Sequence, residues 1–312
     1  MDGRTTTTIR PSVSTRLLQL RRRFAGAPWA ATVEMAARLG YVARGVVYLS
    51  IGLIALLAVA RLAPRPRGAV GALEAWGHWP MGVVLLWLIG LGLYGFAGWR
   101  VLQSVFDADR QGNSGKALAS RAGQALSGLI YGGLAVSTFG LIDTIHDLHR
   151  ANEMAAERAT VAAVLAWPLG SSVVMATGAF IIACGLGNMA RAALDDFGAT
   201  LMCDPKTLAW TSWLARSGYF GRGLAMLPVG VFMLRAGWHE HAAEVKGIGG
   251  ALWALHAQSG GDLVLTLVAL GLMAFGAFAL VEAWFRPIRP EAALESDLGI
   301  HGTSPLRGAS GD

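Results

Sequence analysis

The sequence predicts an all-α polytopic membrane protein in which six transmembrane helices form three parallel two-helix repeats. Hydrophobic residues make up 54% of the 312 positions, charged residues only 15%, and the mean hydropathy is +0.48. This composition is too apolar for an ordinary water-soluble protein of this length. Long apolar segments and a motif that recurs ahead of them give the number of spans and their grouping.

Six apolar segments approach the length of about 20 residues that a helix needs to cross a bilayer. They lie at about 44–60, 81–103, 122–142, 168–190, 218–236 and 262–282. The fifth is the most polar, because Arg222 and Arg235 bracket its apolar run and Pro228 lies within it. We expect these two arginines to extend toward opposite membrane interfaces.

The positive charges predict the orientation of the spans. Most of the 26 arginines and lysines lie in the two tails and in the connections after the second and fourth spans. The positive-inside rule therefore predicts that both termini are cytoplasmic. The net charge of +6 is explained by this topology, so we predict no nucleic-acid partner; the same residues can attract anionic lipid headgroups.

A short motif opens the odd-numbered spans. It occurs as "ARLGYVARGVVYLSIG" (37–52), as "ARSGYFGRGLAMLPVG" (215–230) and, in weaker form, as "ASRAGQALSGLIYGG" (119–133). The shared frame is Arg, any residue, Gly, three residues, Arg or Ser, and Gly. The three copies consist of Arg38, Gly40, Arg44 and Gly45; of Arg121, Gly123, Ser127 and Gly128; and of Arg216, Gly218, Arg222 and Gly223.

The motif spacing predicts repeats at 36–109, 117–197 and 212–286, between flexible tails at 1–35 and 287–312. The second spans also match, since "GWRVLQSVF" (98–106) resembles "AFALVEAWF" (277–285) and places Gln103 opposite Glu282. The middle copy, "GNMARAALD" (187–195), has Arg191 nearby. Two spans return the chain to its starting side, so the units share one orientation and permit a pseudo-threefold axis along the membrane normal.

This repeated pair of spans resembles the bacterial membrane family known as domain of unknown function 1206, in which a two-helix unit occurs three times. The resemblance covers about residues 36–286 and rests on "R-x-G-Y-x-x-R-G" in the first and third copies. The middle copy departs from it at Gln124 and Ser127. The family implies a multi-pass protein of the bacterial cytoplasmic membrane and no established activity.

The polar residues of the motif have two interpretations. Arg44 and Arg222 are either interfacial anchors that extend back toward the cytoplasm, or a ring of cationic groups at the inner mouth of a three-repeat bundle. The glycines predict close helix packing. They do not form a phosphate-binding loop, because the sequence GxxxxGK[ST] is absent.

Candidate chemistry is sparse. The interiors of the spans lack ionisable side chains and catalytic motifs, so we predict no enzyme and no cofactor. The candidates for an outer metal site are His146, His149, His239 and His241. Their spacing matches no metalloprotease motif, and we predict no metal. We predict a non-enzymatic structural or interaction component; the alternative is a channel or uncoupled carrier along the pseudo-threefold axis.

Overall fold

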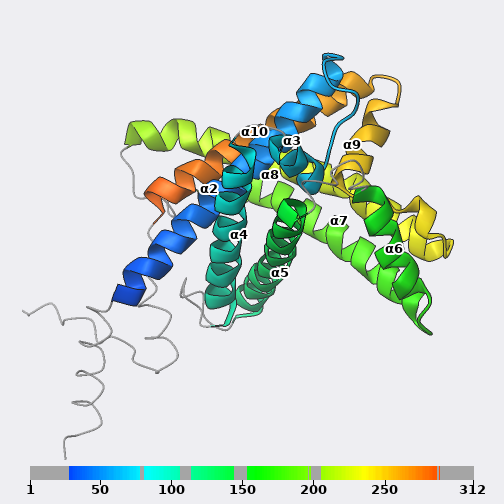
Figure 1. Ribbon diagram of the computed structural model, residues 1–312, viewed down its shortest axis with the longest axis horizontal. Helices are drawn as coiled ribbons and strands as arrows, with labels where there is room; N and C mark the ends of the chain where they lie inside the picture. Colours follow the sequence, from blue (N-terminus) through cyan, green and yellow to red (C-terminus); the bar gives the residue numbers. More distant parts are fainter. Residues whose placement is uncertain are drawn as a thin grey trace, which may run out of the picture.

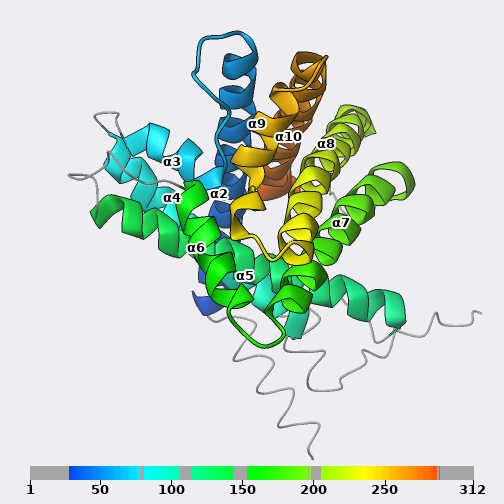
Figure 2. The same ribbon diagram turned by 90° about the vertical axis from the view of Figure 1, so that its right-hand side faces the viewer.

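The computed structural model describes residues 28–77, 81–105, 114–143, 153–195, 197, 205–286 and 288. Within these ranges the secondary structure is helical and contains no strand, which confirms the predicted all-α class (Figures 1 and 2). Most of the predicted tails, residues 1–27 and the greater part of 287–312, lies outside the described residues. Residues 28–35, predicted as flexible tail, instead form the beginning of a helix.

Each predicted apolar segment corresponds to one long helix. These helices are α2 (Pro28–Val59), α4 (Gly82–Val105), α5 (Gly115–Asp143), α7 (Gly170–Leu194), α8 (Pro205–Trp238) and α10 (Gly261–Phe285). All of them except α8 are long and apolar enough to span a bilayer. The prediction of a multi-pass membrane protein is therefore supported for five spans. In α8, Arg216, Arg222 and Arg235 interrupt the apolar sequence, and its spanning role stays a prediction.

The long helices pack in pairs: two pairs are formed by consecutive helices, and one joins the two ends of the described chain. α2 packs along α10, α4 along α5, and α7 along α8, while α2 also contacts α4 and α8 contacts α10 (Figure 1). No comparable contact joins α5 to α7 within the described ranges. Among the five helices with a membrane-spanning window, these two are the least covered: only 28% and 17% of their most apolar windows are buried, against 50% to 56% in α2, α4 and α10.

A short helix lies in each connection between two long helices of one predicted repeat. These helices are α3 (Ala69–Gly77), α6 (Glu153–Leu165) and α9 (Ile248–His256), and the turn η3 (Ala242–Glu244) precedes α9. α3 packs on α2, α4 and α5, α6 packs on α7, and α9 packs on α8 and α10. The sequence patterns did not predict these elements, since we treated the connections as loops.

The long helix that follows each short helix begins at a glycine, namely Gly82 in α4, Gly170 in α7 and Gly261 in α10. A side-chain carbon at Gly82, Gly170 or Gly261 would overlap a main-chain carbonyl of the preceding short helix, at Trp76, Val164 and Leu255 respectively. Main-chain atoms cannot move aside as a flexible side chain can. The tight return from the short helix to the long one therefore requires glycine at these three positions.

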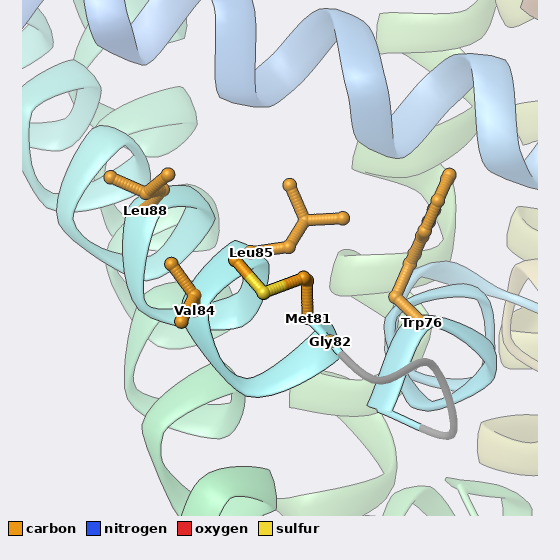
Figure 3. A pocket seen from close by; sticks show the side chains of 6 residues that line it. All are labelled: Trp76, Met81, Gly82, Val84, Leu85 and Leu88. Atoms are coloured by element: carbon orange, nitrogen blue, oxygen red, sulfur yellow. The ribbon is translucent and has the colours of Figure 1, made fainter.

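An apolar pocket of about 330 Å³ lies where α3 gives way to α4 (Figure 3). Its lining consists of Trp76, Met81, Gly82, Val84, Leu85 and Leu88. The indole nitrogen of Trp76 donates a hydrogen bond to the Ser50 hydroxyl, 2.9 Å away, which fixes this wall of the pocket to α2. None of the lining side chains is ionisable, so the pocket offers no charge to a ligand.

Substitution of Gly261 by alanine tests the requirement for glycine. We expect Gly261→Ala to lower the free energy of unfolding by about 1–3 kcal/mol, as overpacking typically does. Gly98→Ala is the matched control, because a carbon added at Gly98 meets no atom within 4 Å. Thermal unfolding in detergent would measure both. Equal midpoints for the two variants would contradict the prediction.

Candidate functional site

The first arginine of each motif copy binds the end of a neighbouring helix. Its guanidinium donates hydrogen bonds of 2.5–3.4 Å to main-chain carbonyls in the last turn of that helix. The pairs are Arg38 with Ala283 and Trp284 of α10, Arg121 with Ser104 and Val105 of α4, and Arg216 with Ala192 and Ala193 of α7. The last carbonyls of a helix lack internal partners and carry partial negative charge, which a cation satisfies. We call the region where these helices meet the motif end.

Motif glycines lie where two helices approach closely. A Cβ at Gly40 would lie 2.5 Å from Phe96 Cβ, and one at Gly218 would lie 2.6 Å from Phe275 Cα. The second glycine of each copy faces a main-chain carbonyl oxygen of another helix. These pairs are Gly45 with Gly276, Gly128 with Ala97, and Gly223 with Gly185. Gly123 differs, because a carbon added there meets nothing within 4 Å.

The second arginine of the first copy is buried rather than directed to the interface. Arg44 is 2% exposed, and its Nη2 forms an ion pair with Oε2 of Glu282 in α10. Its guanidinium carbon also lies 5.0 Å from the ring centres of Phe96 and Phe275. Because an unpaired buried charge is strongly destabilising, the pair fixes α2 against α10. Of the two interpretations of the second arginine, this burial does not fit an anchor that extends back toward the cytoplasm for Arg44.

Glu282 serves more than one arginine. Besides Arg44, it accepts a hydrogen bond of 2.8 Å from Nη1 of Arg286, and it is only 4% exposed. Arg100 lies near the same group: its guanidinium is 4.9 Å from the Phe96 ring centre and donates to Oε1 of Gln103 at 3.1 Å. This region therefore contains more arginines than carboxylates among the described residues.

Arg222 has a different environment from Arg44. Its guanidinium lies 4.8 Å from the ring centre of Phe275 and 5.7 Å from that of Tyr48. The described part of the chain provides no carboxylate as an ion-pair partner. The guanidinium hydrogen-bonds the Tyr48 side chain, while its Nε is buried without a hydrogen bond. Ser127, the third member of the series, is partly buried in α5 and brings no charge to the motif end.

Aromatic rings form a continuous buried layer around these arginines. We call it the aromatic layer, and its members are Tyr41, Tyr48, Phe96, Tyr131, Tyr219 and Phe275. Edge-to-face contacts of 4.8–5.3 Å between ring centres connect members of α2, α4, α5, α8 and α10. A hydrogen bond of 3.3 Å runs from the Tyr131 hydroxyl to that of Tyr48. Aromatic pairs of this geometry stabilise a fold by more than the burial of their apolar surface alone provides.

The candidate outer histidines show no common site. His146 and His149 lie outside the described residues. His239 contacts Glu244, with 2.7 Å between Nδ1 and Oε1, and the hydrogen bond from His239, together with Arg235, lowers the pKa of Glu244. His241 contacts the main-chain carbonyl of His239. Across the described ranges, no three histidine, cysteine or acidic side chains gather closely enough to bind a metal ion.

Comparison with known proteins identifies the two segments that carry the full motif. Residues 39–107 and 217–286 match the model of the family described as Domain of Unknown Function 1206 (DUF1206). The family model therefore matches the chain in two separate segments. The finding confirms the predicted family, and each DUF1206 match runs from the motif in α2 or α8 to the end of α4 or α10. Neither match includes the predicted middle repeat.

An uncharacterised protein of Bacillus subtilis (strain 168), YxxB, is similar to this chain. The two are 28% identical over 263 residues, which cover 83% of this chain and 92% of YxxB. The similarity therefore extends well beyond the two DUF1206 segments. No solved structure matches the chain.

Several residues of the site escaped prediction from the sequence. Phe96 and Phe275 occupy the same place in the two DUF1206 copies, each against the first motif glycine, and each precedes the matched pair Gln103 and Glu282 by two helical turns. Extending the alignment of the second spans toward their amino ends would have shown this. Tyr131, by contrast, gave no signal in the sequence, because its contacts come from α2 and α4.

Neutralisation of Glu282 tests the buried ion pair. We expect Glu282→Gln to lower the free energy of unfolding by about 3–5 kcal/mol, because it leaves the buried Arg44 without its counter-charge. Glu34→Gln is the control: Glu34 pairs with Arg38 at a more exposed position, and we expect a loss of less than about 1 kcal/mol. Detergent-solubilised protein can be unfolded thermally to compare them. Similar losses in both variants would show that burial does not strengthen the dependence on Glu282.

Proposed function

We propose that the protein is a non-enzymatic structural or interaction component of the bacterial cytoplasmic membrane. The observation that carries this proposal is the aromatic layer, which fills the motif end with tightly packed rings. The ionisable groups beside it hold helices together: Arg44 and Arg286 bind Glu282, and Arg38 binds the end of α10. Ionisable side chains that are bound to neighbouring helices in this way stabilise the helix packing.

We also propose that residues 117–197 are a third, diverged unit, and that α8 is a sixth span. Support comes from contacts that recur at one register: the first arginine binds the last turn of the preceding unit, and the second glycine packs on the same helix. With three units about one axis, each first span packs on the second span of the unit before it. The positive-inside rule then gives cytoplasmic termini and brings the motif end to the cytoplasmic side.

A channel or uncoupled carrier is the competing function, and the buried arginines favour it. A conducting path at the motif end would have to part the aromatic layer, whose members are all at most 9% exposed. Closely packed rings leave no room for a hydrated ion. We therefore favour a sealed bundle over a conducting one.

Flux measurements in liposomes distinguish the two functions. We expect liposomes that contain the purified protein to retain a trapped anion, such as chloride, as well as protein-free liposomes do. Protease protection would verify that the protein has inserted. An anion flux that disappears in Arg44→Gln and Arg222→Gln would overturn the structural function in favour of the channel.

The orientation is tested separately, with a peptide tag placed after Asp312. We expect the tag to resist protease added to intact spheroplasts and to be cleaved after lysis, because the charge distribution places the carboxyl terminus inside. A second tag in the connection between α3 and α4, on the predicted outer side, is the matched control and should be cleaved in intact spheroplasts. The reverse pattern would contradict the proposed orientation.

A further inference from the structure

Arg44 and Arg222, the second arginines of the two DUF1206 segments, face different residues on the helices that they pack against. Gly45 packs on the carbonyl of Gly276 in α10, and Gly223 packs in the same way on the carbonyl of Gly185 in α7. This common register aligns α10 with α7, and the residue of α7 that corresponds to Glu282 is Arg191. Where Arg44 finds a carboxylate, Arg222 therefore finds a helix that presents another cation.

The charge of Arg222 thus has no internal counter-ion within the described structure. Arg191 is itself paired with Asp195, at 2.9 Å between Nε and Oδ2, and its guanidinium lies 5.0 Å from the Tyr219 ring centre. The guanidinium of Arg222 hydrogen-bonds the Tyr48 side chain, but its Nε is buried and makes no hydrogen bond, and no carboxylate of the described residues pairs with it. A guanidinium at this depth in a membrane bundle is stable only if an anion or its equivalent approaches it.

Among the described residues, α5 and α7 make no close packing contact with each other on the side of Arg222. In the DUF1206 copies, Phe96 and Phe275 fill the space against Gly40 and Gly218; the register places Cys184 at this position in α7, and Gly123 in α5 meets nothing within 4 Å. Gly133 and Gly187 also face open space. Among the described residues, the absence of a phenylalanine at this position coincides with the lack of close packing between α5 and α7.

The same side presents apolar surface. Ile130, seven residues after Gly123 in α5, is 57% exposed, and Phe180, four residues before Cys184 in α7, is 45% exposed, so both share the helix faces of those residues. Apolar side chains on a spanning helix are covered by acyl chains. A molecule that occupies this side therefore needs an apolar body and an anionic head.

We propose that Arg222 binds the phosphate group of an anionic phospholipid that enters the bundle laterally between α5 and α7. The guanidinium offers a planar fork of donors that suits phosphate oxygens, and the acyl chains would lie along the exposed apolar residues of α5 and α7. The proposal deepens the interaction role proposed above and rests on it, since it supplies the ligand class for that role.

Binding of phosphatidylglycerol to the purified full-length chain in a sugar-based detergent tests this inference. Native mass spectrometry would count bound lipid, and thermal unfolding would report stabilisation. Diacylglycerol with the same acyl chains lacks the phosphate, and inorganic phosphate lacks the chains. We expect phosphatidylglycerol to bind at least about tenfold more tightly than diacylglycerol, as a charge-assisted hydrogen bond to phosphate requires. We expect inorganic phosphate alone to give no comparable stabilisation.

Two variants make the test specific for Arg222. Arg222→Gln removes the cation, and Arg191→Glu keeps Arg222 but places a carboxylate at the position that Glu282 has beside Arg44. We expect each variant to weaken phosphatidylglycerol binding at least about tenfold. Arg235→Gln removes a charge from the other end of α8 and should bind as the unmodified chain does. If Arg222→Gln does not fold, Arg191→Glu still decides the outcome.

The results that would overturn the proposal are distinct. Equal lipid affinity in Arg191→Glu and the unmodified chain would exclude Arg222 as the phosphate ligand. Equal stabilisation by inorganic phosphate would assign the site to a soluble anion, and a lipid-free dimer that depends on Arg222 would assign it to a second chain. Anion flux in liposomes would overturn the proposed function without changing the measured lipid affinities, so the two failures are distinguishable.

Discussion

Burial of the Arg44 guanidinium is the constraint on which the arrangement of the bundle depends. A charge that is 2% exposed among apolar helices needs a partner of opposite charge, and Glu282 of α10 supplies it. The two residues are 238 positions apart, so their ion pair brings the first long helix of the described chain against the last one. The glycine contact between Gly45 and Gly276 then lets the two main chains approach closely along the same line.

The other two motif copies make similar arginine and glycine contacts at the motif end, with differences at individual positions. The first arginine always binds the last turn of a neighbouring helix, which satisfies carbonyls that have no other partner in the membrane. The middle segment departs at several linked positions: Ser127 replaces an arginine, the register places Cys184 where the DUF1206 copies have phenylalanine, and Gly123 has no neighbour. These differences lie between the two segments that match the family model, in the helices α5 and α7, whose most apolar windows are only 28% and 17% buried.

Much of the fold followed from local properties of the chain. The apolar segments located every long helix, because the thickness of the bilayer fixes the length of a span. The short helices α3, α6 and α9 were missed, because they bury small faces on their neighbours and carry no long apolar run. For the site, the motif alignment found the arginines and glycines but not the aromatic layer, whose rings belong to five helices.

The sequence by itself determined the membrane class, the long helical segments, the motif copies and the positions of the costly charges, since each of these depends on composition or on spacing along one helix. Only the tertiary structure decided which way the second arginines point. An arginine near the end of a span has two stable choices, the interface or an internal partner, and its local sequence is the same for both. Arg44 turned inward because α10 presents Glu282, whereas α7 presents Arg191 to the helix of Arg222. Which helix packs against that of the arginine depends on the arrangement of the whole bundle, and the sequence pattern within one span does not predict it.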